Sequence, residues 1–488
     1  MPKAPDAPVA AAHHSGLHRR LTSFDLLLLT LSCLSPVFSV YGPGSDVLQH
    51  AGTGAALLFL FGIGAAAIWG IVYAEFGSAF PYSGGDYVGV GTVLGPATGF
   101  ACLAAWAVFV VPISAYLAIM VGTYVGQVLP AVSVQTVTFG SLAVATAIAL
   151  LAVRTNALLT GIFLAVELLA VLALIVAGLW HPPGSMAVLT HPLIPDGSGH
   201  WVPVATTTMA MGAVSAAFAT AGGNQAIAFG EELIDPHRKM GRVILVACLL
   251  GAVATALPVM AVAWNAGRYA AIFRSDAPFS AFVSTIAGPA AGRALSVAVA
   301  LAVFNALIAQ MLFSARLFFS FARDGIFPSR INRALAKVHE RSGAPRVATL
   351  VVGAGAACCC LLGPHVLLVF VSGVIVYSLG FVSMAVLVGR RRGQTGAPGF
   401  WRSPCYPLMP ILGLALALAF GIAEWSDPEA GRPSLIFLGA MVLAAVAWYR
   451  CVLKRRPGGW APRVRDPSPA APHGRSDPVD HGAAGETD

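Results

Sequence analysis

Long apolar segments recur along this chain, and they constrain its fold more than any other feature. Each runs for about 18 residues or more with few charges, which as a helix is long enough to cross the hydrocarbon core of a bilayer. Hydrophobic residues make up 57% of the 488 residues and charged residues only 10%, whereas a soluble protein carries about a quarter charged residues. The segments of about ten alternating residues that a β-barrel needs are not seen. We therefore predict an all-α polytopic membrane protein.

The apolar segments predict about 12 transmembrane helices joined by polar loops. The first 20 residues lack an apolar core, so we expect no cleavable signal peptide and insertion directed by the first span. The predicted spans cover residues 24–48, 54–79, 96–128, 133–152, 155–180, 202–230, 242–265, 286–322, 346–362, 364–389, 408–424 and 433–453.

Loop charge predicts how the spans are oriented, because Lys and Arg near span ends stay on the cytoplasmic side. With the N-terminus inside, the outer loops hold only Arg268, Arg274, Arg293 and Arg432. We expect a multi-pass protein of the cell membrane (plasma or inner) surrounded by lipid, with both termini cytoplasmic. The net charge of +8 is distributed over alternate loops, which argues against a nucleic-acid partner. The cytoplasmic segments would hold Arg19, Arg20, Arg238, Lys239, Arg242, Arg323, Arg330, Arg333, Lys337, Arg341, Arg346, Arg390, Arg391, Arg392, Lys454, Arg455 and Arg456.

Two predicted spans are interrupted near mid-depth. In residues 34–39 (LSPVFS) of the first span, Pro36 removes a helical N–H donor and its ring clashes with the preceding turn. In residues 219–224 (ATAGGN) of the sixth span, paired glycines weaken the helix. A broken helix persists at membrane depth only where it faces protein or a water-lined cavity. The alternative interpretation is a simple kink and a close helix crossing, since Gly and Pro are frequent in membrane helices.

Broken helices five spans apart predict a binding site, because in many secondary transporters such helices meet at the midplane. Freed N–H groups suit a carboxylate and freed carbonyls suit an ammonium, and an amino acid presents both. We expect the substrate to lie against Ser35, Pro36, Val37, Phe38, Ser39, Phe218, Ala219, Thr220, Gly222, Gly223 and Asn224.

Glu167 lies near the middle of the fifth span, where a charged carboxylate is costly, so it should face the bundle interior. We predict that it carries a proton, the alternative being a structural bond to a neighbouring helix. Asn305 of the eighth span is a candidate partner or substrate contact, although a lone Asn often bridges helices. Arg316 is expected to extend its side chain to the membrane surface. The cluster of Glu231, Glu232 and Asp235, which is followed by Arg238 and Lys239, is interpreted as a solvated helix exit.

The eight cysteines lie mostly inside apolar runs and show no zinc or redox spacing. We interpret them as small apolar residues and predict no metal and no cofactor. The chain from about residue 457 is rich in Pro, Gly, Asp, Arg and Ser, and such a composition predicts disorder.

Several motifs of this chain resemble those of the amino acid-polyamine-organocation family of permeases. The most specific is residues 314–328 (SARLFFSFARDGIFP), followed by Val338-His339 and residues 343–345 (GAP), which is similar to the family's eighth span and following loop. Residues 73–77 (YAEFG), with Phe80-Pro81 and Gly84-Gly85, resemble the second span and first cytoplasmic loop. Gly222-Gly223 and Gly230-Glu231-Glu232 resemble the sixth span and its exit.

The resemblance implies a LeuT-like core of five plus five inverted helices and two added C-terminal spans. It suggests a cytoplasmic segment at residues 1–20, a transport core at 21–389, two additional helices at 390–453 and a disordered cytoplasmic tail at 454–488. It also implies that substrate binds between helices one and six. The family's glycine-rich break falls here on residues 36–38, and Asn224 and Gln225 stand where relatives have an aromatic residue and a Glu.

We therefore expect a secondary active transporter, or permease, for an amino acid or related amine, working by alternating access and coupled to protons. Exchange of two solutes is the alternative mode. A membrane sensor on the same scaffold would bind ligand without moving it, but no soluble signalling domain follows the last span. A membrane enzyme would need acidic, His or Cys residues clustered at one membrane face, so we do not predict an enzyme.

Overall fold

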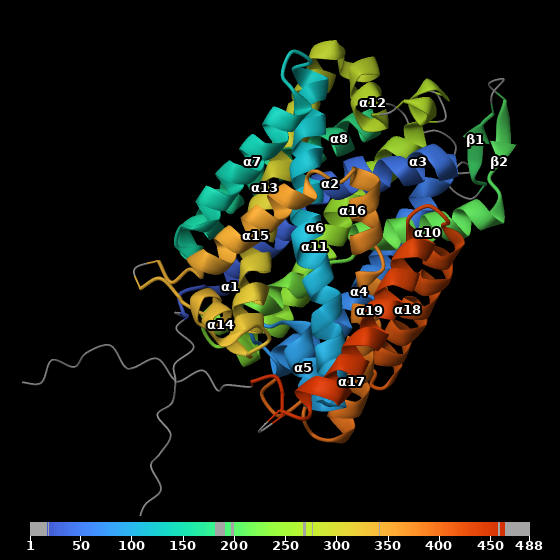
Figure 1. Cartoon of the computed structure of the whole chain (residues 1–488). Helices are drawn as coiled ribbons and strands as arrows, with labels where there is room; N and C mark the ends of the chain where they lie inside the picture. Colours follow the sequence, from blue (N-terminus) through green and yellow to red (C-terminus); the bar gives the residue numbers. More distant parts are fainter. Residues whose placement is uncertain are drawn as a thin grey trace, which may run out of the picture.

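The computed structural model describes residues 17, 19–180, 191–196, 200–266, 270–275, 277–340, 342–456 and 459–463. These residues form a bundle of long helices with one small hairpin at its edge (Figure 1). Within these described residues, eight helical segments are long and apolar enough to cross a membrane, by length and composition, and the first of them covers both predicted spans one and two. The remaining predicted spans coincide with two shorter helices and one interrupted helix. The predicted all-α fold is confirmed.

The helices follow the predicted spans closely. The first half of the chain holds α1 (Ser23–Leu34), α2 (Pro36–Ser39), η1 (Val40–Gly44), α3 (Ser45–Ala51), η2 (Gly52–Gly54), α4 (Ala55–Ala79), α5 (Asp86–Leu94), α6 (Pro96–Val128), α7 (Val134–Ala149), α8 (Val153–Trp180), β1 (Leu193–Pro195), β2 (Trp201–Pro203), α10 (Thr206–Thr220) and η3 (Asn224–Glu232). The second half holds α11 (Pro236–Ala266), η4 (Ala270–Arg274), α12 (Pro278–Ala287), α13 (Pro289–Arg323), α14 (Ser329–Leu335), α15 (Arg346–Cys359), α16 (Pro364–Val371), α17 (Val374–Arg391), α18 (Leu408–Ser426), α19 (Gly431–Trp448) and η5 (Tyr449–Leu453).

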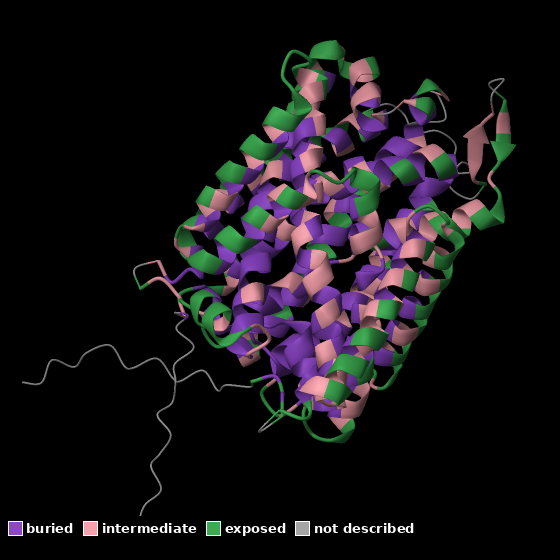
Figure 2. Cartoon of the chain, in the orientation of Figure 1, coloured by how far each residue is buried: buried purple, intermediate pink, exposed green. Residues whose placement is uncertain are grey.

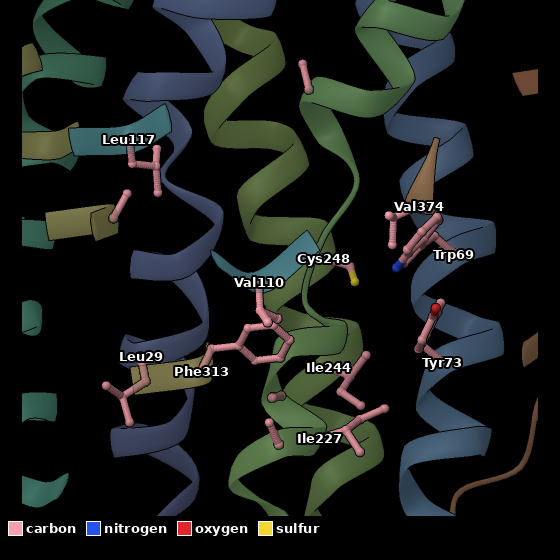
Figure 3. Packing of buried hydrophobic residues seen from close by; sticks show 14 of the residues in the cluster. Leu29, Trp69, Tyr73, Val110, Leu117, Ile227, Ile244, Cys248, Phe313 and Val374 are labelled. Atoms are coloured by element: carbon pink, nitrogen blue, oxygen red, sulfur yellow. The ribbon is translucent and has the colours of Figure 1, made fainter. Parts of the chain in front are cut away.

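The core of the bundle is made by the helices that also frame the two interruptions. Helix α11 packs along α4, and α13 packs along α6. Buried residues fill the interior, while exposed side chains are distributed over the outer helices (Figure 2). Figure 3 shows how Leu29 of α1, Phe313 of α13 and Cys248 of α11 contribute to this interior. Because α1 contacts α8, α11 and α13, the broken first span runs through the middle of the core.

The end of the bundle that carries α5 and α14, which we call the α5 end, is held by buried carboxylates. Glu75 at the end of α4 accepts two hydrogen bonds from the guanidinium of Arg390, at 2.8 and 2.7 Å. Asp86 begins α5 and accepts hydrogen bonds from the hydroxyls of Tyr73 and Ser378. These contacts join α4, α5 and α17, so the loop between the second and third spans is fixed to the bundle.

Asp86 lies outside the spanning helices, and its titration predicts a pH-dependent stability. Burial raises the pKa of Asp86 to about 6, although the hydrogen bonds from Ser378 and Tyr73 act in the opposite direction. Since the folded state binds the proton more tightly, the stabilisation is complete below pH of about 4 and is lost as the pH rises through 6. A shift of about two pKa units corresponds to roughly 3 kcal/mol. We expect Asp86→Asn to flatten this part of the melting-temperature profile of the purified protein.

Asp324, just after α13, is the internal comparison for that experiment. Burial also raises the pKa of Asp324 to about 6, against the effect of the neighbouring Arg323 guanidinium. The two carboxyls therefore act in the same pH window and with the same sign, so Asp86→Asn should remove part of the slope and leave the part that Asp324 contributes. An unchanged profile in Asp86→Asn would contradict the role given to Asp86.

The beginning of the tail differs from the disorder predicted for residues 454–488. Trp460 is buried, its indole N–H donates to the Asp324 carbonyl at 3.0 Å, and its ring lies edge-on to Phe100. Composition predicted disorder because it is an average over the whole tail, and one large aromatic residue such as Trp460 hardly changes that average. Residues 457, 458 and 464–488 lie outside the described residues, so the prediction for them stays a prediction.

Candidate functional site

The first span is interrupted where the sequence predicted it. Helix α1 ends at Leu34, and Ser35 adopts φ 43° and ψ 81°, a left-handed conformation that is uncommon for a residue other than glycine. Pro36 then begins α2 and has no N–H to donate. The break therefore frees the N–H of Val37 at the start of a new helical segment. Val37 is only 2% exposed, so this N–H group lies inside the bundle.

The sixth span is interrupted more completely. Helix α10 ends at Thr220, and η3 begins at Asn224 after an extended connection. Gly222 and Gly223 in this connection have φ values of 154° and 85°, a region that favours glycine. The Cys248 thiol donates to the Gly222 carbonyl over 2.8 Å. The thiol of α11 thus satisfies one of the carbonyls that the break releases, and no local sequence pattern predicts this contact.

The two interruptions touch each other through Leu34. A Cβ added to Gly222 would lie 2.8 Å from both Cγ and Cδ1 of Leu34, and one added to Gly251 of α11 would lie 2.7 Å from Cδ1. The last residue of α1 therefore fits into a notch that two glycines leave on the sixth and seventh spans. The predicted meeting of the first and sixth breaks is present in the structure.

Gly222→Ala is expected to destabilise the protein, because the new methyl group meets Leu34 and the residue must keep a positive φ. We expect a loss of about 1–3 kcal/mol, seen as a lower melting temperature in detergent. Gly64→Ala is the matched control, since a Cβ at this α4 glycine has no atom within 4 Å. Equal melting temperatures for the two variants would contradict the notch.

Glu167 of α8 closes the first break. Its Oε1 accepts hydrogen bonds from the Ser35 hydroxyl and from the Val37 N–H, both at 2.9 Å. The side chain is completely buried. The predicted inward direction of Glu167 is correct, and the structure adds that its carboxylate binds the freed N–H group itself.

Two further polar groups remain unpaired beside this contact. Among the described residues, Glu167 Oε2 and both amide atoms of Asn305 have no hydrogen-bond partner. Asn305 is fully buried on α13 and approaches the Glu167 carboxylate without completing a hydrogen bond. Buried polar groups are nearly always paired in folded proteins, so this cluster of α2, α8 and α13 has capacity for another group.

The other predicted site residues differ in their contacts and in how deeply they are buried. Thr220 donates to the Gly62 carbonyl at 2.9 Å and so joins α10 to α4. The side chain of Phe38 is half-buried and packs edge-on against Tyr116. Phe218 is 36% exposed, on the last turn of α10, and so differs from the predicted residues that the core covers. Those buried residues are Ser35, Pro36, Val37, Ser39, Ala219, Thr220, Gly222, Gly223 and Asn224.

The exit of the sixth span is not the solvated cluster that the sequence suggested. Glu231 and Glu232 are buried, and only Asp235 pairs with a nearby Lys, Lys239. Glu232 Oε1 lies 2.5 Å from Arg316 Nε, and Glu231 Oε2 lies 2.7 Å from Arg323 Nη1. Both bases come from α13, which is distant in sequence. The prediction of a solvated exit is therefore wrong for Glu231 and Glu232, whereas Asp235 keeps its local pair with Lys239.

Arg316 also corrects a prediction. It is 1% exposed, donates to Glu232 and to the Leu312 carbonyl, and lies 4.4 Å from the ring centre of Phe229. Its side chain therefore does not extend to the surface, because a buried carboxylate of the sixth span holds it inside the bundle.

A backbone link accompanies these ion pairs. The N–H groups of Arg20 and Leu21 both donate to the Glu232 carbonyl at 2.9 Å, and the Ile234 N–H donates to the Leu21 carbonyl at 3.1 Å. The segment before α1 is thus paired with the segment after η3. Together with the ion pairs, this link closes the α5 end of the bundle between the first, sixth and eighth spans.

The opposite end of the bundle is more open. A cavity of about 680 Å³ lies between α3, α10, α16 and the α18–α19 turn, and its lining includes Asp46, His50, His365 and Glu424. By contrast, the space beside Val37, Tyr41 and Ala170 does not admit a water molecule. The first interruption is therefore enclosed by packed side chains in this structure.

Comparison with known proteins agrees with this architecture. The family model described as amino acid permease matches residues 21–446, which include both broken spans and the α13 ion pairs. The chain belongs to the amino acid permease family. This permease is 27% identical to the Asc-type amino acid transporter 1 of Mus musculus, over 86% of its own length and 74% of that protein.

Two bacterial relatives align with similar shares of this chain. The permease is 25% identical to the methylthioribose transporter of Bacillus subtilis (strain 168), over 84% of its length and 89% of that protein. It is 24% identical to the branched-chain amino acid permease BcaP of Lactococcus lactis subsp. cremoris (strain MG1363), over 80% and 87%. All three relatives are named as transporters or permeases. The predictions of an amino acid permease and of its fold class are confirmed.

Proposed function

We propose that this permease is a secondary transporter of an amino acid or related amine that works by alternating access and performs no enzymatic reaction. The single observation that carries the proposal is the pair of broken spans in contact at Leu34 and Gly222, five spans apart in a chain of this family. Such helices meet at the substrate site of many secondary transporters. Residues 21–389 would form the transport core and residues 390–453 the two added helices.

In this proposal the substrate lies between the two breaks. The C-terminal ends of α1 and α10 offer carbonyls, while the Val37 N–H at the start of α2 is bonded to Glu167 and reaches a substrate only if that carboxylate moves. Movement of the first, second, sixth and seventh spans against the others would open the site to each side in turn. The tight packing around Val37 corresponds to a closed state in that cycle.

We propose that coupling runs through Glu167, with Asn305 beside it. A buried carboxylate in a span is a natural proton carrier, because its charged form is costly there. Its hydrogen bonds to Ser35 and Val37 connect its protonation to the geometry of the first break. Exchange of two solutes is the alternative mode.

We also propose that the permease lies in the cell membrane with the α5 end on the cytoplasmic side. The basic residues Arg390, Arg391 and Arg392 end α17 at this end, as the positive-inside rule requires. The ion pairs of Arg316 and Arg323 then form the cytoplasmic closure of the transport path.

Uptake by reconstituted vesicles tests the proposed function. Purified permease would be offered radiolabelled amino acids and polyamines, with and without a pH gradient. Saturable, temperature-dependent uptake of at least one solute is expected. Protein-free vesicles and vesicles with heat-unfolded permease are the controls. The absence of saturable uptake across the panel would reject the substrate class.

A further inference from the structure

Glu167 occupies the donors that a substrate carboxylate would need. The N–H of Val37 is the group released at the first break, and Ser35 supplies the neighbouring hydroxyl. Both point at one oxygen of the Glu167 carboxylate, at 2.9 Å. An amino acid could use these donors only after displacing that carboxylate. The first break is therefore already filled by an acidic group belonging to the protein.

The free side of the same carboxylate has no basic side chain beside it. Glu167 Oε2 has no hydrogen-bond partner, and no Lys, Arg or His within the described ranges lies within 4.0 Å of the carboxylate. Asn305 adds an amide oxygen that is equally unpaired. Two buried acceptors side by side, without a cation, match a group that carries several N–H donors and a positive charge.

We propose that Glu167 is the fixed carboxylate of the binding site, and that the preferred substrate is a primary amine without a carboxylate of its own. The ammonium would donate to Glu167 Oε2 and Asn305 Oδ1, while Ser35 and Val37 hold Oε1 in place. This inference rests on the proposed function and narrows its substrate class.

Charge supports the same preference. A second carboxylate beside the first break would stand next to that of Glu167 in a medium of low dielectric, where like charges repel strongly. An amine brings only the cation that the site lacks. An amino acid would bind with Glu167 either displaced or protonated, and both conditions weaken its binding relative to the amine.

Matched pairs of solutes that differ only in the carboxylate test this proposal. Serine is compared with ethanolamine, and arginine with agmatine, as competitors of uptake in reconstituted vesicles. We expect the amine of each pair to bind at least tenfold more tightly than its parent amino acid. Thermal stabilisation of the purified permease by each solute measures binding without requiring transport.

A substitution of Glu167 tests the assigned group directly. Glu167→Gln keeps the shape and one acceptor oxygen but removes the charge, so it should weaken ethanolamine binding at least tenfold and strengthen serine binding. Glu429→Gln, at an exposed residue of the α18–α19 turn that lines the open cavity, is the control and should keep the wild-type preference. Should Glu167→Gln fail to fold, the wild-type pairs decide.

The outcomes separate this inference from the proposed function. Amino acids binding as well as, or better than, their amines would overturn the inference while leaving transport intact. Stabilisation by amines without any uptake would support the inference and reject the transporter. If neither amines nor amino acids stabilise the protein, the inference fails.

Discussion

Arg316→Met is expected to lower the free energy of unfolding by about 3–5 kcal/mol, the largest stability effect predicted for a single side chain of this permease. The substitution keeps much of the side-chain volume but leaves Glu232 as an uncompensated buried carboxylate. It also removes the contact over the Phe229 ring. Unfolding of the purified permease in mixed detergent micelles, followed by circular dichroism, would measure the loss.

Two further variants show whether the buried charge is the cause. Glu232→Gln in the Arg316→Met background should recover a large part of the loss, because no carboxylate is then left unpaired. Lys239→Met removes the exposed pair with Asp235 and should cost less than about 1 kcal/mol. If Arg316→Met is no more destabilising than Lys239→Met, the buried ion pair is not what holds this end closed.

Glu167→Gln is expected to abolish the response of transport to a pH gradient. Glutamine keeps a hydrogen-bond acceptor for Ser35 and Val37 but cannot carry a proton. The measured quantity is the ratio of uptake with and without an imposed pH gradient, for whichever solute the wild type moves. We expect a ratio of at least about ten for the wild type and near one for the variant, since a tenfold change corresponds to only about 1.4 kcal/mol.

The ratio separates coupling from simple loss of activity, because both measurements use the same variant. Glu429→Gln should retain the wild-type ratio, as Glu429 is an exposed residue of the α18–α19 turn beside the open cavity, away from the breaks. If the Glu167→Gln permease still accumulates solute in response to the gradient, Glu167 is not the coupling residue. The protein would then still be a transporter, with its coupling group at another position.

The spans and their interruptions were predictable because their signals are local. A membrane-length apolar run, Pro36 and the Gly222-Gly223 pair each act within a few residues of the chain. The same locality explains why Glu167 could be assigned an inward direction but no partner. Ser35 and Val37 lie more than a hundred residues before it, so only the packing of α1 on α8 brings them together.

The closure of the α5 end could not be predicted for the same reason. Glu231 and Glu232 have basic neighbours in sequence, and a local interpretation therefore pairs them with the helix exit. Packing instead places them against Arg316 and Arg323 of α13, where burial strengthens each pairing and excludes water. The notch for Leu34 was equally unpredictable. Glycines in a span indicate a weak helix, but they do not indicate which side chain packs against them.

The backbone pairing of Arg20 and Leu21 with Glu232 should tolerate substitution of the side chains at these positions. Its three hydrogen bonds use main-chain atoms, so exchanging any of the side chains leaves the linkage in place. Only a residue that lacks an N–H, such as proline at position 21, would remove a donor. The entry of the first span and the exit of the sixth are thus joined through their main chains, and they should move as one piece when the α5 end opens.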